Sequence, residues 1–101
     1  MSYPDQLEDL CDDIHDWQLK TFPCATVASK IEHLRREVEE LSREATPGEI
    51  ADCLMLLIGI AKLQNVSILG ALRDKLRINK SRTWGEPDAL GVVEHVEQVN
   101  G

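Results

Sequence analysis

The segment REVEELSREATPGEIADCLML, residues 36–56, joins two helical patterns across a short break. Before the break, apolar residues recur at spacings of four and three, which indicates a helix from about Thr26 to Ala45 with Thr26 suited to the N-cap. The apolar positions of this pattern are Val27, Ile31, Leu34, Val38, Leu41 and Ala45. After the break, Thr46 suits an N-cap, Pro47 suits the first helical position and Glu49 completes a capping box, so a second helix begins here. Because the connection is short, we expect the two helices to pack as an antiparallel hairpin.

Two further helices flank this hairpin. The first runs from about Asp5 to Lys20 and ends before Pro23, since the residue before a proline is disfavoured in helices. Its apolar face consists of Leu7, Leu10, Ile14 and Trp17. The last starts near Ser67, with apolar positions Ile68, Leu69, Leu72 and Leu76. The pattern after Asp88 is weak, so the sequence predicts an all-α four-helix domain over residues 1–88 and a flexible C-terminal tail over residues 89–101.

The helix that follows Asp52 is apolar on every side from Cys53 to Ala61. A helix of this kind is buried all round, and a chain of 101 residues has too little protein to surround it. We therefore expect a bundle that is completed by oligomerisation. The run is far shorter than the ~20 residues that cross a membrane, so no membrane association is expected.

Composition excludes several classes of protein. The net charge of −7 argues against a general nucleic-acid binder, because phosphate backbones require a basic surface. The three cysteines are odd in number and form no CxxC pair, which is typical of reduced thiols in a cytoplasmic protein. The polar, acidic opening MSYPDQLEDL is unlike a signal peptide.

Two acidic pairs flank the break between the central helices. Glu37 and Glu40 are three residues apart, as are Glu49 and Asp52, so each pair shares a helical face. In an antiparallel hairpin, Glu37 can face Asp52 and Glu40 can face Glu49. Four clustered carboxylates repel one another unless something compensates, and a hard cation such as Mg²⁺ prefers oxygen ligands.

A structural interpretation of the same acids remains open. Glu49 can simply cap its helix, and Glu37 and Glu40 can be surface acids near Arg36 or Arg43. Asp52 is harder to explain in this way, because it directly precedes the apolar run and a buried carboxylate is costly without a partner.

Four segments together resemble a known family. EVEEL followed by EIADCLMLL is similar to the ExxE…ExxD signature of the MazG-like all-α nucleoside triphosphate pyrophosphohydrolases. KLRINKSRTWG is similar to the basic segment of phage-type and bacterial members, and HDWQLKTFP to their N-terminal helix. The resemblance extends from about Asp16 to Gly85, which is most of the chain.

This resemblance implies a fold and an activity. Family members are helical dimers or dimers of dimers that depend on Mg²⁺, with Mn²⁺ as an alternative. They cleave a (deoxy)nucleoside triphosphate between the α and β phosphates and release the monophosphate and pyrophosphate. The expected protein is therefore an enzyme that acts on the nucleotide pool in the cytoplasm, without nucleic-acid or membrane partners.

The resemblance also assigns roles to individual residues. The metal ligands would be Glu37, Glu40, Glu49 and Asp52, with Glu37 or Glu40 as general base. Lys80 and Arg82 would hold phosphate oxygens, and Asn79 would bond to phosphate or sugar. Trp17 or Trp84 would stack on the base.

Other observations on these residues keep alternatives open. Trp17 lies on the apolar face of its helix, which favours core packing over stacking. Lys30 is expected to be exposed. His33 lies four residues before Glu37 and can touch the edge of the site, but a surface histidine is the favoured interpretation. Arg36 stands where many relatives have a glutamate. This departure supports a second hypothesis, a non-catalytic dimerising module of the same fold.

Overall fold

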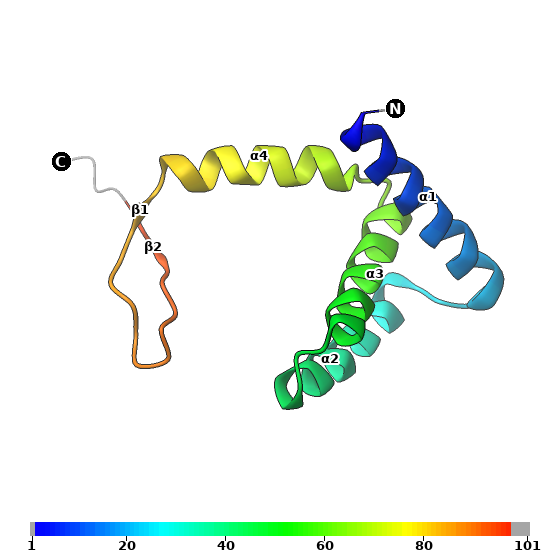
Figure 1. The fold of residues 1–101 in the computed structure, drawn as a ribbon, viewed down its shortest axis with the longest axis horizontal. Helices are drawn as coiled ribbons and strands as arrows, with labels where there is room; N and C mark the ends of the chain where they lie inside the picture. The colour runs from blue at the N-terminus through cyan, green and yellow to red at the C-terminus, as the bar shows by residue number, and fades with distance from the viewer. Residues whose placement is uncertain (1, 98–101) are drawn as a thin grey trace. The chain divides into compact units, whose positions relative to one another are not determined.

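The computed structural model describes residues 2–97, and its regular structure is almost entirely helical (Figure 1). The elements are α1 (Tyr3–Thr21), α2 (Val27–Arg43), α3 (Pro47–Leu63), α4 (Ile68–Ser81), β1 (Thr83–Trp84) and β2 (His95–Val96). The predicted all-α class and the four helices are confirmed; α1 and α2 have both ends, and α3 and α4 their starts, close to the expected positions.

Side chains of threonine start the two central helices. Thr26 accepts a hydrogen bond from the Ser29 backbone at 3.1 Å, and Ser29 accepts one from the Thr26 backbone at 2.8 Å, which completes a capping box. Thr46 accepts from the Glu49 backbone at 3.1 Å. The capping box predicted for Glu49 is wrong in its second half, because the Thr46 backbone donates to the Glu44 carbonyl instead. The Glu49 carboxylate is therefore free to face α2.

The chain forms two compact units, the first ending at Leu69 and the second beginning at Gly70. In the first unit, α3 packs against both α1 and α2, and α2 and α3 form the predicted antiparallel hairpin (Figure 1). The buried apolar residues are Cys11, Ile14, Cys53 and Leu56. This small core lies where α1 meets α3.

The opposite side of α3 is exposed in the single chain. Ile50, Leu54 and Leu57 are each about half exposed and follow one another at helical spacing. The prediction that α3 is buried on all sides is therefore not met within one chain, because α1 and α2 cover only one side of it. Burial of the exposed face by a second subunit stays a prediction.

The second unit contains most of α4 and the two short strands. β1 and β2 are antiparallel, with Thr83 opposite Val96 and Trp84 opposite His95. The Trp84 ring packs edge to face against His95, with centroids 6.2 Å apart. The sequence did not predict this strand pair, which brings residues 95–96 of the expected tail back to the end of α4. The domain boundary at residue 88 stays a prediction, and residues 98–101 of the tail lie outside the described residues.

Within residues 2–97, no single helix is long and apolar enough to cross a membrane; only α3 and α4 taken together across their break meet that requirement, on length and composition alone. The three cysteines are free thiols, of which Cys11 and Cys53 are buried.

Candidate active site

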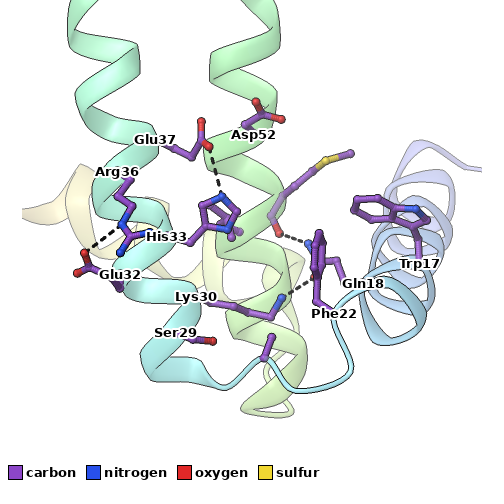
Figure 2. A pocket seen from close by; sticks show the side chains of 13 residues that line it. Trp17, Gln18, Phe22, Ser29, Lys30, Glu32, His33, Arg36, Glu37 and Asp52 are labelled. Carbon is purple, nitrogen blue, oxygen red and sulfur yellow. Dashed lines mark hydrogen bonds and ion pairs between the residues drawn. The ribbon is translucent and has the colours of Figure 1, made fainter.

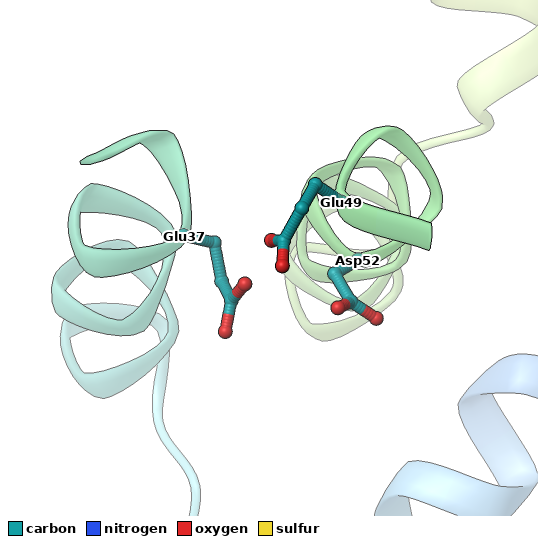
Figure 3. Close-up of side chains that lie close together, drawn as sticks. All are labelled: Glu37, Glu49 and Asp52. Atoms are coloured by element: carbon teal, nitrogen blue, oxygen red, sulfur yellow. The ribbon is translucent and has the colours of Figure 1, made fainter. Parts of the chain in front are cut away.

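Three carboxylates converge between α2 and α3. Glu37 extends from α2, and Glu49 and Asp52 extend from the facing side of α3 (Figure 3). Each residue offers an oxygen, and these oxygens all lie within 4.8 Å of one another. The hairpin explains this arrangement, because residues three apart on α3 share the face that packs toward Glu37.

The electrostatics of this acidic cluster are unfavourable without a counter-charge. Glu49 Oε2 is buried and has no hydrogen-bond partner among the residues that the structure describes. Burial raises the pKa of Glu49, and the nearby carboxylates of Glu37, Asp52 and Glu40 raise it further. The cluster is therefore set up to take a proton or a cation.

Glu40 lies outside this cluster of three. Its carboxylate accepts from Arg43 Nη1 at 2.9 Å, which is the surface pairing that the structural interpretation offered. Glu37 and Glu40 share a helical face, but the ion pair with Arg43 holds the Glu40 carboxylate on its own helix. Glu37 lies near Asp52 as expected. Glu49, which was expected to face Glu40, lies near Glu37 instead. The role of Glu40 as a ligand or base stays a prediction.

The edge of the cluster contains a histidine. His33 Nε2 lies 3.3 Å from Glu37 Oε1, one helical turn away on α2. His33 is a surface residue, as expected, and it also makes the contact with Glu37 that their four-residue spacing allowed. Arg36 turns to Glu32, with Nε 3.3 Å from Oε1, and so does not pair with the cluster (Figure 2).

A pocket of about 590 Å³ opens beside Glu37 and Asp52 and extends between α1, α2 and α3 (Figure 2). Trp17 forms one wall and is 52% exposed, and its ring meets Phe22 edge to face with centroids 5.4 Å apart. The preference for core packing of Trp17 is therefore wrong. The exposed ring is available for stacking.

The other end of the pocket carries a buried polar pair. Lys30 is 6% exposed and Gln18 is 4% exposed. Lys30 Nζ donates to Gln18 Oε1 at 3.2 Å, and Gln18 Nε2 donates to the Met55 carbonyl at 2.9 Å. Burial lowers the pKa of Lys30. The expectation that Lys30 is exposed is wrong, because α2 turns it inward toward α1 and α3.

The remaining predicted substrate residues lie in the second unit. Trp84 Nε1 donates to the Asn79 carbonyl at 2.9 Å, and Arg82 Nη1 donates to Asn79 Oδ1 at 3.4 Å. Lys80 is exposed at the end of α4. Asn79 therefore contacts both Trp84 and Arg82, and the roles of all four residues toward a substrate stay predictions.

Residues 10–100 match the family of dATP/dGTP pyrophosphohydrolases. The chain belongs to this family. The match covers both units and confirms the resemblance to MazG-like enzymes that the acidic and basic segments indicated.

Individual relatives agree with the family. The chain is 37% identical over 73 residues to a dATP/dGTP diphosphohydrolase of Salmonella phage PMBT28, covering 70% of this chain and 25% of the relative. It is 34% identical over 83 residues to a dATP/dGTP diphosphohydrolase of Cyanophage S-2L, covering 82% of this chain and 77% of the relative. The chain thus spans only a quarter of the length of the Salmonella phage protein.

A solved structure has the same fold. The Cyanophage S-2L MazG-like pyrophosphohydrolase, bound to dGDP and three catalytic Mn²⁺ ions per active site, superimposes with a TM-score of 0.80 at 30% identity. The match covers 91% of this chain and 94% of that one. The predicted MazG-like all-α fold is thereby confirmed.

For this member of the dATP/dGTP pyrophosphohydrolase family, sequence reasoning missed Gln18 and Lys30. One signal was present: Gly59 interrupts an otherwise apolar helix, and a glycine at such a position usually has a packing reason. A Cβ at Gly59 would lie 2.3 Å from Gln18 Oε1. Nothing in the local sequence indicated which side chains approach that glycine.

Proposed function

We propose that this protein hydrolyses purine deoxynucleoside triphosphates between the α and β phosphates, releasing the monophosphate and pyrophosphate. The carrying observation is the cluster of Glu37, Glu49 and Asp52 at the mouth of a pocket with an aromatic wall. The names of the phage relatives as dATP/dGTP diphosphohydrolases support this reaction and substrate class.

The cluster fits a divalent metal ion. Three carboxylates from two helices offer converging oxygens, and one buried oxygen of Glu49 has no partner in the described part of the chain. Such oxygen-only sites suit Mg²⁺ and Mn²⁺. When bound, the ion supplies positive charge that polarises the phosphoryl oxygens and screens the triphosphate. Glu40 is retained as a further ligand in this proposal.

The chain's own residues have separate tasks. Glu37 is the preferred general base, since His33 at 3.3 Å orients its carboxylate, with Glu40 as the alternative. Trp17 stacks on the base at the pocket wall. Trp84 is retained as a second stacking candidate. Charge-assisted contacts to the phosphates come from Lys80 and Arg82, with Asn79 bonding to phosphate or sugar.

The active assembly in this proposal is a homodimer or a dimer of dimers. The exposed apolar face of α3, formed by Ile50, Leu54 and Leu57, supports an interface with another copy of the chain. A cytoplasmic location and the absence of nucleic-acid and membrane partners remain part of the proposal.

The alternative function is a non-catalytic dimerising module. Arg36, which stands where the resemblance to the MazG-like family implies a glutamate, is the observation that favours it. The three converging carboxylates favour the enzyme, since a buried carboxylate oxygen without a hydrogen-bond partner requires an explanation and a bound cation supplies one.

Pyrophosphate release tests both functions. The protein is assayed against the common ribo- and deoxynucleoside triphosphates with and without Mg²⁺ or Mn²⁺. Asp52→Asn should lower kcat/KM by about 10²-fold or more, because it removes charge at the metal site. The exposed Asp13→Asn is the matched control, and circular dichroism checks that helical content is unchanged. Near-normal turnover of Asp52→Asn would show that the metal site is misassigned.

A further inference from the structure

Lys30 and Gln18 are the two buried polar residues of the pocket end that lies away from Glu37 and Asp52 (Figure 2). No carboxylate is ion-paired with Lys30 in the part of the chain that the structure describes, and its hydrogen bond goes to neutral Gln18. A buried ammonium without a counter-charge is costly for folding. A ligand that supplies acceptors at this point would explain its presence.

Gly59 makes room for the pair. A Cβ at this position would lie 2.3 Å from Gln18 Oε1 and 3.0 Å from Lys30 Nζ. Glycine in the middle of a helix lowers stability, so its place in α3 is accounted for by the close approach of these two side chains. Gly59 and Gln18 therefore act as positioning residues that fix Lys30 Nζ at the pocket.

The spacing along α2 assigns the two ends of the pocket to different parts of a nucleotide. Lys30 and Glu37 are seven residues apart, which corresponds to roughly 10 Å along the helix axis. This is about the length of a nucleotide from its phosphates to the far edge of its base. With phosphates at the acidic end, the base lies beside Trp17 and its edge reaches Lys30.

We infer that Lys30, held by Gln18 and Gly59, reads the major-groove edge of a purine and selects guanine over adenine. The inference rests on the proposed function and deepens it. The names of the phage relatives include both purines, and the inference states which of the two this chain prefers. A lysine has three donors and no acceptor, and Gln18 uses one of them. Two donors remain for the base.

The two purines differ at this edge. Guanine presents two acceptors, N7 and O6, whereas adenine presents the N7 acceptor and a donating N6 amino group. Opposite Lys30, the adenine amino group would meet another donor and remain unpaired, which is unfavourable in a buried site. We expect kcat/KM for a purine whose edge matches the Lys30 donors to exceed kcat/KM for a mismatched purine by about tenfold to a hundredfold.

The wild-type protein allows a first test without any substitution. We expect dGTP and dITP, which share O6 and N7, to be hydrolysed about tenfold or more faster in kcat/KM than dATP. The analogue 7-deaza-dGTP lacks the N7 acceptor, so its kcat/KM should be lower than that of dGTP and closer to that of dATP. Equal values for dGTP, 7-deaza-dGTP and dATP would overturn the inference.

The variant Lys30→Met then tests the residue itself. It should lower kcat/KM for dGTP much more than kcat/KM for dATP, because only guanine presents two acceptors to Lys30, and the exposed Lys20→Met should behave like wild type. An equal loss for both purines would make Lys30 a structural residue and overturn the inference.

Calorimetry with the non-hydrolysable α,β-imido analogues of dGTP and dATP repeats the comparison. Absent hydrolysis would then count against the proposed function, while equal binding of the two analogues would count against base selection.

Discussion

Glu49 is the residue at which folding and metal binding are most directly in conflict. Its pKa is raised by burial and by the carboxylates of Glu37, Asp52 and Glu40, so the folded state holds a proton on Glu49 more tightly than the unfolded state. The resulting contribution to stability is present below the ordinary glutamate pKa of about 4.3 and is lost as pH rises through the raised value. At neutral pH, repulsion between Glu49 and the neighbouring carboxylates therefore destabilises the metal-free fold.

The variant Glu49→Gln should remove this pH dependence. In the presence of a chelator, its Tm should match that of wild type near pH 4, close to the ordinary glutamate pKa, and exceed it increasingly toward neutral pH. Mg²⁺ or Mn²⁺ should raise the wild-type Tm and raise the variant's less, because a ligand is missing. Thermal melts across this pH range make the measurement. A Tm difference that is independent of pH would contradict the repulsion described for Glu49.

Gly59 offers a test of packing at the buried pair. Gly59→Ala should destabilise the protein by about 1–3 kcal/mol, because the new methyl group displaces Gln18 from its hydrogen bonds with Lys30 and Met55. Gly48→Ala is the control, since its Cβ would meet nothing closer than Thr46 Oγ1 at 3.9 Å. Urea denaturation measures both. Equal stabilities of the two variants would mean that Gln18 relaxes freely.

Single residues of the site were predictable where helical spacing alone fixed their direction. The spacing of Glu37, Glu49 and Asp52 around a short turn was sufficient to predict that they meet. It was not sufficient for Glu40, because an ion pair with Arg43 on its own helix competes for its carboxylate. Lys30 was misjudged because its burial depends on where α1 packs, which local sequence does not specify.

At the scale of elements, the sequence predicted helices well and missed the strands. Threonine caps and apolar spacing placed both ends of α2 and the start of α3 within a few residues. The strands β1 and β2 have two residues each, too few to show an alternating pattern. Their pairing also joins residues distant in sequence, so it depends on tertiary contacts rather than on local preference.

The basic end of α4 is the element whose function is most open to test. Lys80→Ala and Arg82→Ala should each raise KM for a triphosphate substrate by about tenfold to a hundredfold, because charge-assisted contacts contribute ~1.5–3 kcal/mol. If the contacts strengthen as charge moves onto pyrophosphate, kcat should fall too. Lys75→Ala, an exposed lysine on the same helix, is the control. Wild-type kinetics in all three variants would reduce the basic end to charge balancing.

At the scale of the whole molecule, the small core is the main feature to explain. Among residues 2–97, the buried apolar side chains are those of Cys11, Ile14, Cys53 and Leu56, which is few for a domain of this length. Larger apolar residues remain exposed on α1, α2 and α3, and α3 has its most regular exposed face at Ile50, Leu54 and Leu57. Monomeric proteins rarely expose continuous apolar faces of this kind. The sequence indicated that one chain could not bury α3 completely, because the run from Cys53 to Ala61 is apolar on every side.

Assembly is therefore the property by which the whole fold can be tested. Light scattering at micromolar concentration should report at least a dimer, with an apolar helical interface in the range of about 1,200 Å² of buried surface or more. Leu54→Asp places a charge at the centre of the exposed α3 face and should shift the protein toward monomers and lower its Tm, because the charge must be desolvated on association. Leu90→Asp is the control, since Leu90 is 90% exposed in the loop of the second unit and its substitution should leave the assembly intact. A wild-type monomer at these concentrations would mean that the exposed face of α3 is tolerated in water and that the small core alone supports the fold.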